Sequence, residues 1–85
     1  MTIEKLQQIF EETESKWDGD NAFQGLSIIS KYVTDGDILT GAGHDIIYSV
    51  DIADIVENIT EEDAVSLAKL NWMIDEEMDC FAVFV

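Results

Sequence analysis

The residues best suited to chemistry are a single histidine and its acidic neighbour. His44 stands beside Asp45, and a carboxylate next to an imidazole can orient it for proton transfer or for holding a metal ion. Neighbouring residues of a strand point to opposite faces, so in a strand this pair would not interact. A histidine–aspartate metal centre also needs further histidines, and the chain has one. We therefore expect His44 to lie at the start of a strand and to bond to backbone.

Cys80 is the one thiol that could act as a nucleophile. It would need His44 as a base and positive surroundings that lower its pKa. Instead it follows the carboxylates of Glu76, Glu77 and Asp79, which raise its pKa. We expect Cys80 to be a small residue of the core or of a sheet edge, and we predict that the protein is not an enzyme. An enzyme centred on the histidine pair or on this thiol is our third hypothesis.

Two short acidic segments look like cation-binding loops, Asp-Gly-Asp-Asn at residues 18–21 and Asp-Gly-Asp at residues 35–37. Calcium loops of the EF-hand type follow a D-x-[DN]-x-[DN]-G frame with a glutamate at the twelfth position, and neither segment matches it. Gly-Ala-Gly at residues 41–43 lacks the following lysine or the third spaced glycine of a phosphate loop. We expect ordinary turns, no bound metal and no cofactor.

Acidic residues far outnumber basic ones: 19 Asp and Glu stand against four Lys, for a formal net charge of −15. Such a chain is repelled by nucleic acid and by anionic membranes, and it is attracted to basic protein surfaces. A single cysteine excludes an internal disulfide, the first residues do not form a secretory signal, and the apolar runs are too short to cross a bilayer. We expect a soluble, cytoplasmic protein that binds neither nucleic acid nor membrane directly.

The arrangement of the charge is uneven, because several acidic residues and no Lys or Arg occur from Tyr32 to Ala68. Carboxylates at three-residue steps share one side of a helix, roughly 5–6 Å apart, which is comparable to the spacing of phosphates along a nucleic acid. The candidate partner-binding residues are Asp51, Asp54, Glu57, Glu61, Glu62 and Asp63. The alternative is a solvated face that keeps the protein soluble, against which stands the destabilising effect of unopposed like charges.

The chain is long enough for a single domain with one core, spanning residues 1–85, of which 47% are hydrophobic. Apolar residues recur at helical spacing over residues 2–17, after an N-cap at Thr2, and over residues 21–33, where Asn21 supplies the cap. We attribute Gly25 inside the second helix to close packing against another backbone, and the alternative is that it merely weakens a marginal helix.

A hairpin is expected next, from strands at residues 38–40 and 46–50 with the glycine break at residues 41–43 between them. Residues 51–58 fit a short helix or a strand, and we favour the helix.

A capping box at residues 60–63 begins a further helix, which ends at Asn71 in a left-handed conformation. A second hairpin then pairs residues 72–75 with residues 80–85. The predicted fold class is α+β: a small domain with an antiparallel sheet of about four strands in two hairpins, packed on one face by three to four helices. A domain of this size is marginally stable alone, which favours a partner or a homodimer.

Several blocks of residues resemble a group of small, acidic, uncharacterised proteins of bacteria and their phages, over residues 21–85. The blocks are Asn21-Ala22-Phe23-Gln24-Gly25-Leu26, Lys31-Tyr32, His44-Asp45-Ile46-Ile47-Tyr48, Thr60-Glu61-Glu62-Asp63-Ala64, Leu70-Asn71-Trp72, Asp75-Glu76-Glu77 and Phe81-Ala82-Val83-Phe84-Val85. The resemblance implies no reaction. By analogy alone, a mobile-element origin favours an inhibitor of host nucleic-acid enzymes.

Two binding hypotheses follow. In the leading one, the acidic face docks on a basic protein surface as a nucleic-acid mimic that inhibits a host nuclease, a defence complex or a DNA-binding regulator. In the second, the chain is a structural or regulatory subunit that dimerises or joins an assembly through an apolar patch of Trp17, Trp72 and Phe84.

Overall fold

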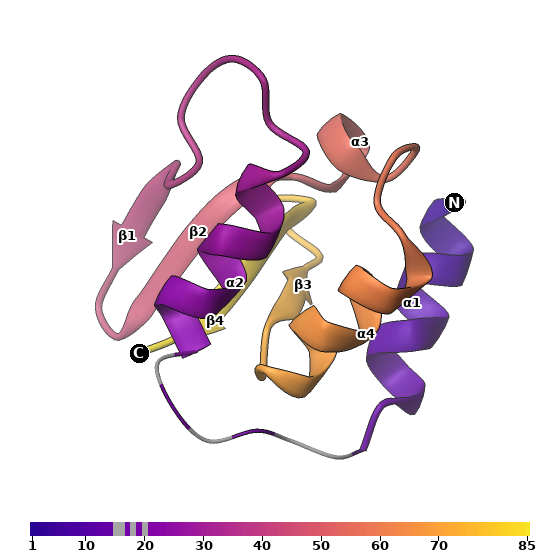
Figure 1. The fold of residues 1–85 in the computed structure, drawn as a ribbon. Coiled ribbons are helices and arrows are strands. Elements are labelled where there is room, and N and C mark those ends of the chain that lie inside the picture. The colour runs from indigo at the N-terminus through magenta and orange to yellow at the C-terminus, as the bar shows by residue number, and fades with distance from the viewer. Residues whose placement is uncertain (15–16, 18, 20) are drawn as a thin grey trace.

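The chain folds into one four-stranded antiparallel sheet with helices, as a computed structural model that describes residues 1–14, 17, 19 and 21–85 shows (Figure 1). The elements in chain order are α1 (Ile3–Glu12), α2 (Asn21–Ser30), β1 (Gly41–Gly43), β2 (Ile46–Asp51), α3 (Ile52–Ile55), α4 (Glu61–Lys69), β3 (Met73–Asp75) and β4 (Cys80–Phe84). The strand order is β1-β2-β4-β3, so two hairpins meet where β2 pairs with β4. The predicted α+β class and its two hairpins are confirmed.

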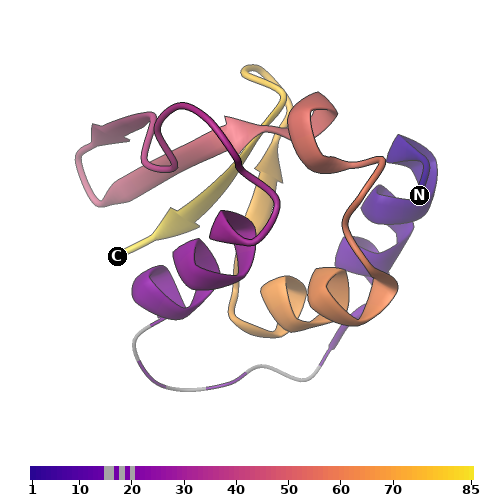
Figure 2. The ribbon, with the colours of Figure 1, turned by 45° about the horizontal axis from the view of Figure 1, so that its top comes forward.

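The helices α1, α2 and α4 lie on one side of the sheet, and the core lies between (Figure 2). Val83 opposes Ile47 and Phe81 opposes Ile74 across the strand pairs, so all four side chains point toward the helices. Phe81 is fully buried, and its ring centre lies 6.1 Å from that of Phe10 on α1's side of the core. No helix in the described part of the chain is long and apolar enough to span a membrane.

Helix α1 begins as predicted and ends early. The hydroxyl of Thr2 accepts a hydrogen bond of 3.1 Å from the backbone N–H of Lys5, which is an N-cap. The prediction of a helix to residue 17 is wrong, because Thr13 adopts an extended conformation and its hydroxyl donates back to the carbonyl of Ile9 at 2.7 Å. Trp17 instead donates its backbone N–H to the carbonyl of Lys69 at 2.8 Å, so it is tied to the end of α4. Residues 15 and 16 lie outside the described residues.

Helix α2 ends at Ser30, before the predicted residue 33, and Lys31 and Tyr32 continue as a turn. Asn21 is the first residue of the helix, and its side-chain oxygen is buried without a hydrogen-bond partner in the described part of the chain, so the predicted capping role is not found. Gly25 does permit a close contact, but the neighbour is the indole of Trp72 and not a backbone.

The first hairpin is shifted relative to the prediction. Its first strand is Gly41–Gly43, the predicted break, while residues 38–40 run beside β2 without being a strand of the sheet. Side chains explain the shift: the hydroxyl of Ser49 donates to the carbonyl of Ile38 at 2.6 Å, and the hydroxyl of Thr40 donates to the carbonyl of Ser49 at 2.8 Å. These bonds take the place of regular ladder bonds, and β2 carries a register irregularity between Tyr48 and Asp51.

The remaining elements follow the prediction closely. The helix favoured over a strand at residues 51–58 is present as α3, although it is shorter, at Ile52–Ile55. The hydroxyl of Thr60 accepts from the backbone N–H of Asp63 at 3.1 Å and caps α4. Asn71 has a φ of 67°, which confirms its left-handed conformation at the helix end.

Candidate protein-binding surface

The structure brings two acidic segments together that are far apart in the sequence. A cleft of about 610 Å³ lies between the loop that follows α2 and the junction of β2 with α3. Asp35 and Asp37 line it from the loop, and Asp51 and Asp54 line it from the junction. None of its described lining residues is a lysine or a histidine. The cleft is therefore a place where unopposed carboxylates gather.

Burial of the isoleucines determines where the junction carboxylates point. Ile52 and Ile55 belong to the core, and Asp51 and Asp54, each of which precedes one of these isoleucines, are exposed. The backbone N–H of Ile52 donates to the carbonyl of Asp79 at 2.9 Å, which holds the start of α3 against the turn before β4. The two carboxylates thus lie at the junction of β2 and α3, which this hydrogen bond ties to the turn before β4.

The six predicted partner-binding residues differ in their exposure and in their ion pairs. Asp51, Asp54, Glu57 and Glu62 are exposed, and no ion pair to another described residue is found for them. Glu61 is also exposed, but its carboxylate lies 3.0 Å from the Nζ atom of Lys5 in α1. Residues 32–68 contain no lysine in the sequence, but the fold brings Lys5 of α1 next to Glu61 of this stretch.

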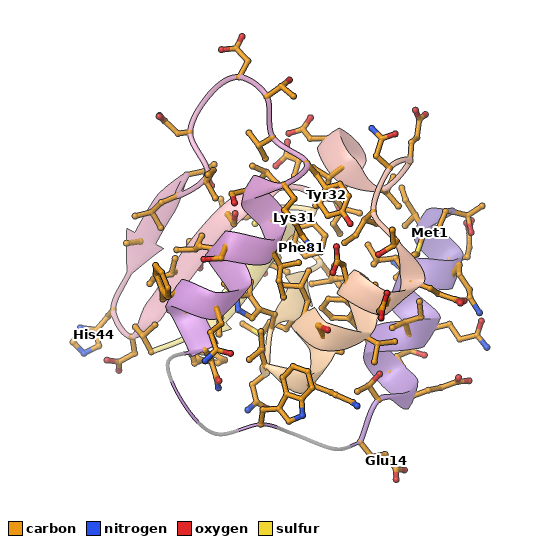
Figure 3. All side chains as sticks on the ribbon, in the orientation of Figure 1. Met1, Glu14, Lys31, Tyr32, His44 and Phe81 are labelled. Atoms are coloured by element: carbon orange, nitrogen blue, oxygen red, sulfur yellow. The ribbon has the colours of Figure 1, made fainter. Side chains whose placement is uncertain are left out.

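Asp63 is engaged inside the fold. Its carboxylate accepts a hydrogen bond from the hydroxyl of Tyr32, lies 2.8 Å from the Nζ atom of Lys31, and is 17% exposed. Burial raises the pKa of Asp63, but the hydrogen bonds from Lys31 and Tyr32 outweigh it and hold this pKa below its usual value. The same hydroxyl accepts from the backbone N–H of Thr60 at 3.3 Å, so the end of α2 is joined to the start of α4. Lys31 and Tyr32 are labelled in Figure 3.

His44 and Asp45 lie in the turn between β1 and β2 and not in a strand, which corrects the expectation that they point apart. Asp45 has a φ of 67°, and the Nε2 atom of His44 lies 3.7 Å from a carboxylate oxygen of Asp45. The imidazole is 98% exposed and projects from the body of the protein (Figure 3). An exposed pair at the tip of a hairpin provides no cavity in which water could be excluded from a reaction.

Cys80 is buried, at the start of β4, as a core or edge residue was expected to be. Burial raises the pKa of its thiol, and the nearby carboxylates of Asp75, Asp51 and Asp79 raise it further. A nucleophilic thiol needs the opposite environment. Among the described residues, no group of three or more histidine, cysteine or acidic side chains is arranged to hold a metal ion.

The aromatic patch of the second hypothesis does not exist as one surface. Trp72 is only 3% exposed and belongs to the core. The ring of Trp17 lies under the Nζ atom of Lys69, 5.3 Å from the ring centre. Phe84 is exposed on the sheet. Trp72 packs against Gly25 of α2, on the face of the sheet that the helices cover, so it does not share a surface with Phe84.

The sequence missed Asp35 and Asp37 as members of the acidic surface. Their signal was present in the Asp-Gly-Asp turn, but their proximity to Asp51 and Asp54 depends on how the loop returns along β2. Comparison of the chain with protein-family models, with curated proteins and with solved structures gives no match.

Proposed function

We propose that this protein is a non-enzymatic binding protein whose acidic cleft docks on a basic protein surface. The supporting observation is the convergence of Asp35, Asp37, Asp51 and Asp54 on one cleft whose described lining residues include no lysine. We define these four residues as the acidic cleft set. Glu57 and Glu62 are exposed as well, and they follow α3 in the chain.

The charges of the acidic cleft set are not balanced by a cation among the described lining residues. Four carboxylates on one cleft repel one another, and in the free protein only water and counterions relieve that repulsion. A partner that supplies Lys or Arg side chains would relieve it through charge-assisted hydrogen bonds, which are about twice as strong as neutral ones. Binding would therefore remove a destabilising feature of the free protein.

Proteins with suitable basic surfaces are those that bind nucleic acid, because they use Lys and Arg to contact phosphates. The proposed target is thus a nuclease, a defence complex or a DNA-binding regulator, and the carboxylates would occupy the place of its phosphates. The resemblance to small phage proteins agrees with an inhibitor, by analogy. The proposed location is the cytoplasm, where such targets are found.

Affinity capture with matched variants tests this proposal. The protein is immobilised, exposed to a lysate of its source cell, and washed at low and then at high salt. In one variant, the four aspartates of the acidic cleft set are changed to Asn. In the control variant, four exposed glutamates elsewhere are changed to Gln, so that both variants have the same net charge. The control residues are Glu4, Glu11, Glu76 and Glu77.

We expect the unmodified protein and the control to retain the same nucleic-acid-binding protein at low salt and to release it at high salt. The cleft variant should fail to retain it. Equal loss in both variants would show that net charge alone matters and would contradict a defined cleft. Retention that persists at high salt would contradict charge pairing as the basis of binding.

A further inference from the structure

Strand β3 forms one edge of the sheet, because the strand order is β1-β2-β4-β3 (Figure 1). The hydrogen bonds at the two ends of β4 show which side of this strand each residue faces. The backbone N–H of Val85 donates to the carbonyl of Asp45 at 3.0 Å, and the backbone N–H of Ile52 donates to the carbonyl of Asp79 at 2.9 Å. Backbone groups of successive strand residues point to opposite sides, so the odd-numbered residues of β4 face β2 and the even-numbered ones face β3.

Ile74 is the residue of β3 whose backbone groups point away from the sheet. Met73 opposes Ala82 and Asp75 opposes Cys80, so these two pairs exchange the hydrogen bonds between β3 and β4. The N–H and C=O of Ile74 alternate with them and face outward. Outside the sheet, the hydrogen bonds found among the described residues include none to Ile74. One donor and one acceptor are therefore available at this edge.

A cavity of about 240 Å³ lies between α1 and β3. No described residue of β4 lines it, so it lies on the outer side of β3, next to the backbone of Ile74. We call it the edge groove. Helix α1 contributes Gln7, Phe10 and Glu11 to it, and the segment around β3 contributes Trp72, Ile74 and Glu76.

The edge groove combines apolar side chains with carboxylates. Trp72 belongs to the core, and Phe10 and Ile74 pack against that core. Glu11 and Glu76 are exposed, and none of the described lining residues is a lysine or a histidine. A ligand in the groove thus meets backbone hydrogen-bonding groups, apolar surface and unopposed negative charge together. Nucleic acid and anionic segments would be repelled there.

We propose that the edge groove binds an extended, basic segment of a partner protein, which adds to the sheet as a strand beside β3. The backbone of the segment pairs with the N–H and C=O of Ile74. The residue opposite Ile74 points to the same side of the sheet, so an apolar side chain there enters the groove against Phe10. Lys or Arg residues nearby in the segment form charge-assisted hydrogen bonds with Glu11 and Glu76.

Charge distinguishes this partner from a second copy of the chain. The copy's own edge, residues 72–76, reads Trp-Met-Ile-Asp-Glu and contains no cation. Edge-to-edge pairing would bring further carboxylates to Glu11 and Glu76 in two chains that each carry a net charge of −15. A segment with Lys or Arg relieves the same charges.

The edge groove is separate from the acidic cleft set. The cleft lies between the loop after α2 and the junction of β2 with α3, and the two cavities share no described lining residue. Binding at the groove is therefore a function beyond the one proposed above, with its own partner.

Fluorescence anisotropy with a labelled peptide tests the proposal. The probe is Ser-Lys-Thr-Val-Thr-Lys-Ser, which sets one apolar residue between two lysines. A second peptide carries an N-methyl group on the valine, which removes the N–H that would bond to Ile74. A third carries it on the threonine before the valine, whose N–H would point to solvent. All three peptides have the same charge.

We expect N-methylation of the valine to weaken binding about tenfold, the effect of one lost hydrogen bond, and N-methylation of the threonine to weaken it much less. Equal binding of the two methylated peptides would overturn strand addition. Failure of the unmethylated probe to bind at about 1 mM would overturn the proposal as a whole.

Matched protein variants test the two carboxylates. In one variant Glu11→Gln is combined with Glu76→Gln, and in the control Glu14→Gln is combined with Glu77→Gln, two exposed positions that do not line the groove. Both variants have the same net charge. The first should weaken binding of the probe about tenfold or more, and the control should change it little. Equal weakening would mean that net charge alone attracts the peptide and would overturn the assigned groove.

Amide hydrogen exchange measured by NMR locates the bound peptide. In the free protein the amide of Ile74 should exchange faster than those of Met73 and Asp75, which bond to β4, and the probe should slow it. An unchanged rate at Ile74 with the probe bound would overturn the proposal. So would slowing that grows with protein concentration in the absence of peptide, because it would assign this edge to a second copy.

The variants of the acidic cleft set separate the two proposals. The variant with all four cleft aspartates changed to Asn should still bind the probe. The variant of Glu4, Glu11, Glu76 and Glu77 should lose the probe and still retain the partner of the cleft. Loss of the probe in the cleft variant would overturn the edge groove, and failure of the groove leaves the proposed function standing.

Discussion

The indole of Trp72 occupies the space that a side chain at Gly25 would need. A Cβ atom built on Gly25 would lie 1.8 Å from the Nε1 atom of this indole and 2.2 Å from its Cε2 atom. The same Nε1–H donates a hydrogen bond of 2.9 Å to the carbonyl of Asn21, one turn earlier in α2. Contacts on two successive turns thus fix the position of α2 relative to the start of β3.

The first prediction concerns this contact. Gly25→Ala should destabilise the protein, although alanine in an exposed helix would stabilise it by about 1 kcal/mol. The added methyl group must displace an indole that is itself packed in the core, and overpacking of this kind costs about 1–3 kcal/mol or more. Urea denaturation followed by circular dichroism measures the change. Gly41→Ala, where the nearest side-chain atom is 3.7 Å away, is the matched control and should change stability little.

A double-mutant cycle identifies the indole as the cause. Trp72→Phe removes the hydrogen bond to Asn21 and leaves a smaller ring, so it should destabilise the protein by itself. In that background, Gly25→Ala should cost clearly less than in the native protein, because the space beside residue 25 is larger. Additive effects would contradict direct contact between the two residues as the source of the destabilisation.

The fold followed from the sequence wherever the signal was local. Thr2 and Thr60 were recognised as caps from residue type and spacing, and Asn71 as a left-handed helix end, because each depends on a few neighbouring residues. The predicted end of α1 and the predicted position of β1 were wrong. Helix α1 ends where the hydroxyl of Thr13 bonds back to the carbonyl of Ile9. The position of β1 depends on a distant contact, the bond from the Ser49 hydroxyl to the carbonyl of Ile38, which no local pattern reveals.

The candidate site followed from the sequence in part. The exposure of Asp54 could be anticipated, because it lies between the core isoleucines at positions 52 and 55 on a predicted helix. The proximity of Asp35 to Asp51 and Asp54 could not be anticipated, since it depends on the path of the loop that follows α2. The pairing of Asp63 with Lys31 could not be anticipated either, because it joins α4 to the turn after α2 across 32 positions of the chain.

The second prediction uses the low pKa of Asp63. Because this pKa is lower in the folded protein than in the unfolded chain, the carboxylate contributes stability above its unfolded pKa of about 3.9, and that contribution disappears as the pH falls through the folded pKa. Asp63→Asn should destabilise the protein by about 1–3 kcal/mol at pH 7, since the Tyr32 hydroxyl and Lys31 lose their charged acceptor. As the pH falls through the folded pKa, the difference in stability between the variant and the native protein should shrink.

Asp54→Asn is the control for the second prediction, because its carboxylate is exposed and has no ion-pair partner among the described residues. Thermal unfolding from pH 2 to pH 7 provides the measurement. A penalty for Asp63→Asn that stayed constant across this range would mean that packing, and not the charge, is responsible. Tyr32→Phe should lose part of the same pH-dependent stability, since it removes one of the hydrogen-bond donors to this carboxylate.

The third prediction concerns Cys80. Its thiol is buried and its pKa is raised by burial and by three carboxylates, so it should react with a thiol reagent only when the protein unfolds. At neutral pH, the labelling rate in the native state should equal the rate of opening and should rise to that of a free thiol in denaturant. Mass spectrometry follows the modification over time. Rapid labelling of the native protein at pH 7 would contradict this account and would reopen the hypothesis of a thiol enzyme.

The last prediction separates the two interpretations of the acidic surface. Changing Asp35, Asp37, Asp51 and Asp54 to Asn should stabilise the protein, by about 0.3 kcal/mol for each repulsion removed, because the cleft has no lysine among its described lining residues. The gain should shrink at high salt, where the repulsion is screened. If the carboxylates serve solubility alone, this variant should lose solubility and keep every partner that the native protein binds. If they form a docking surface, it should be more stable and should lose the partner. A residue set that lowers stability while enabling binding is the pattern expected of a functional site, and thermal unfolding and capture of the same four-residue variant decide between the two.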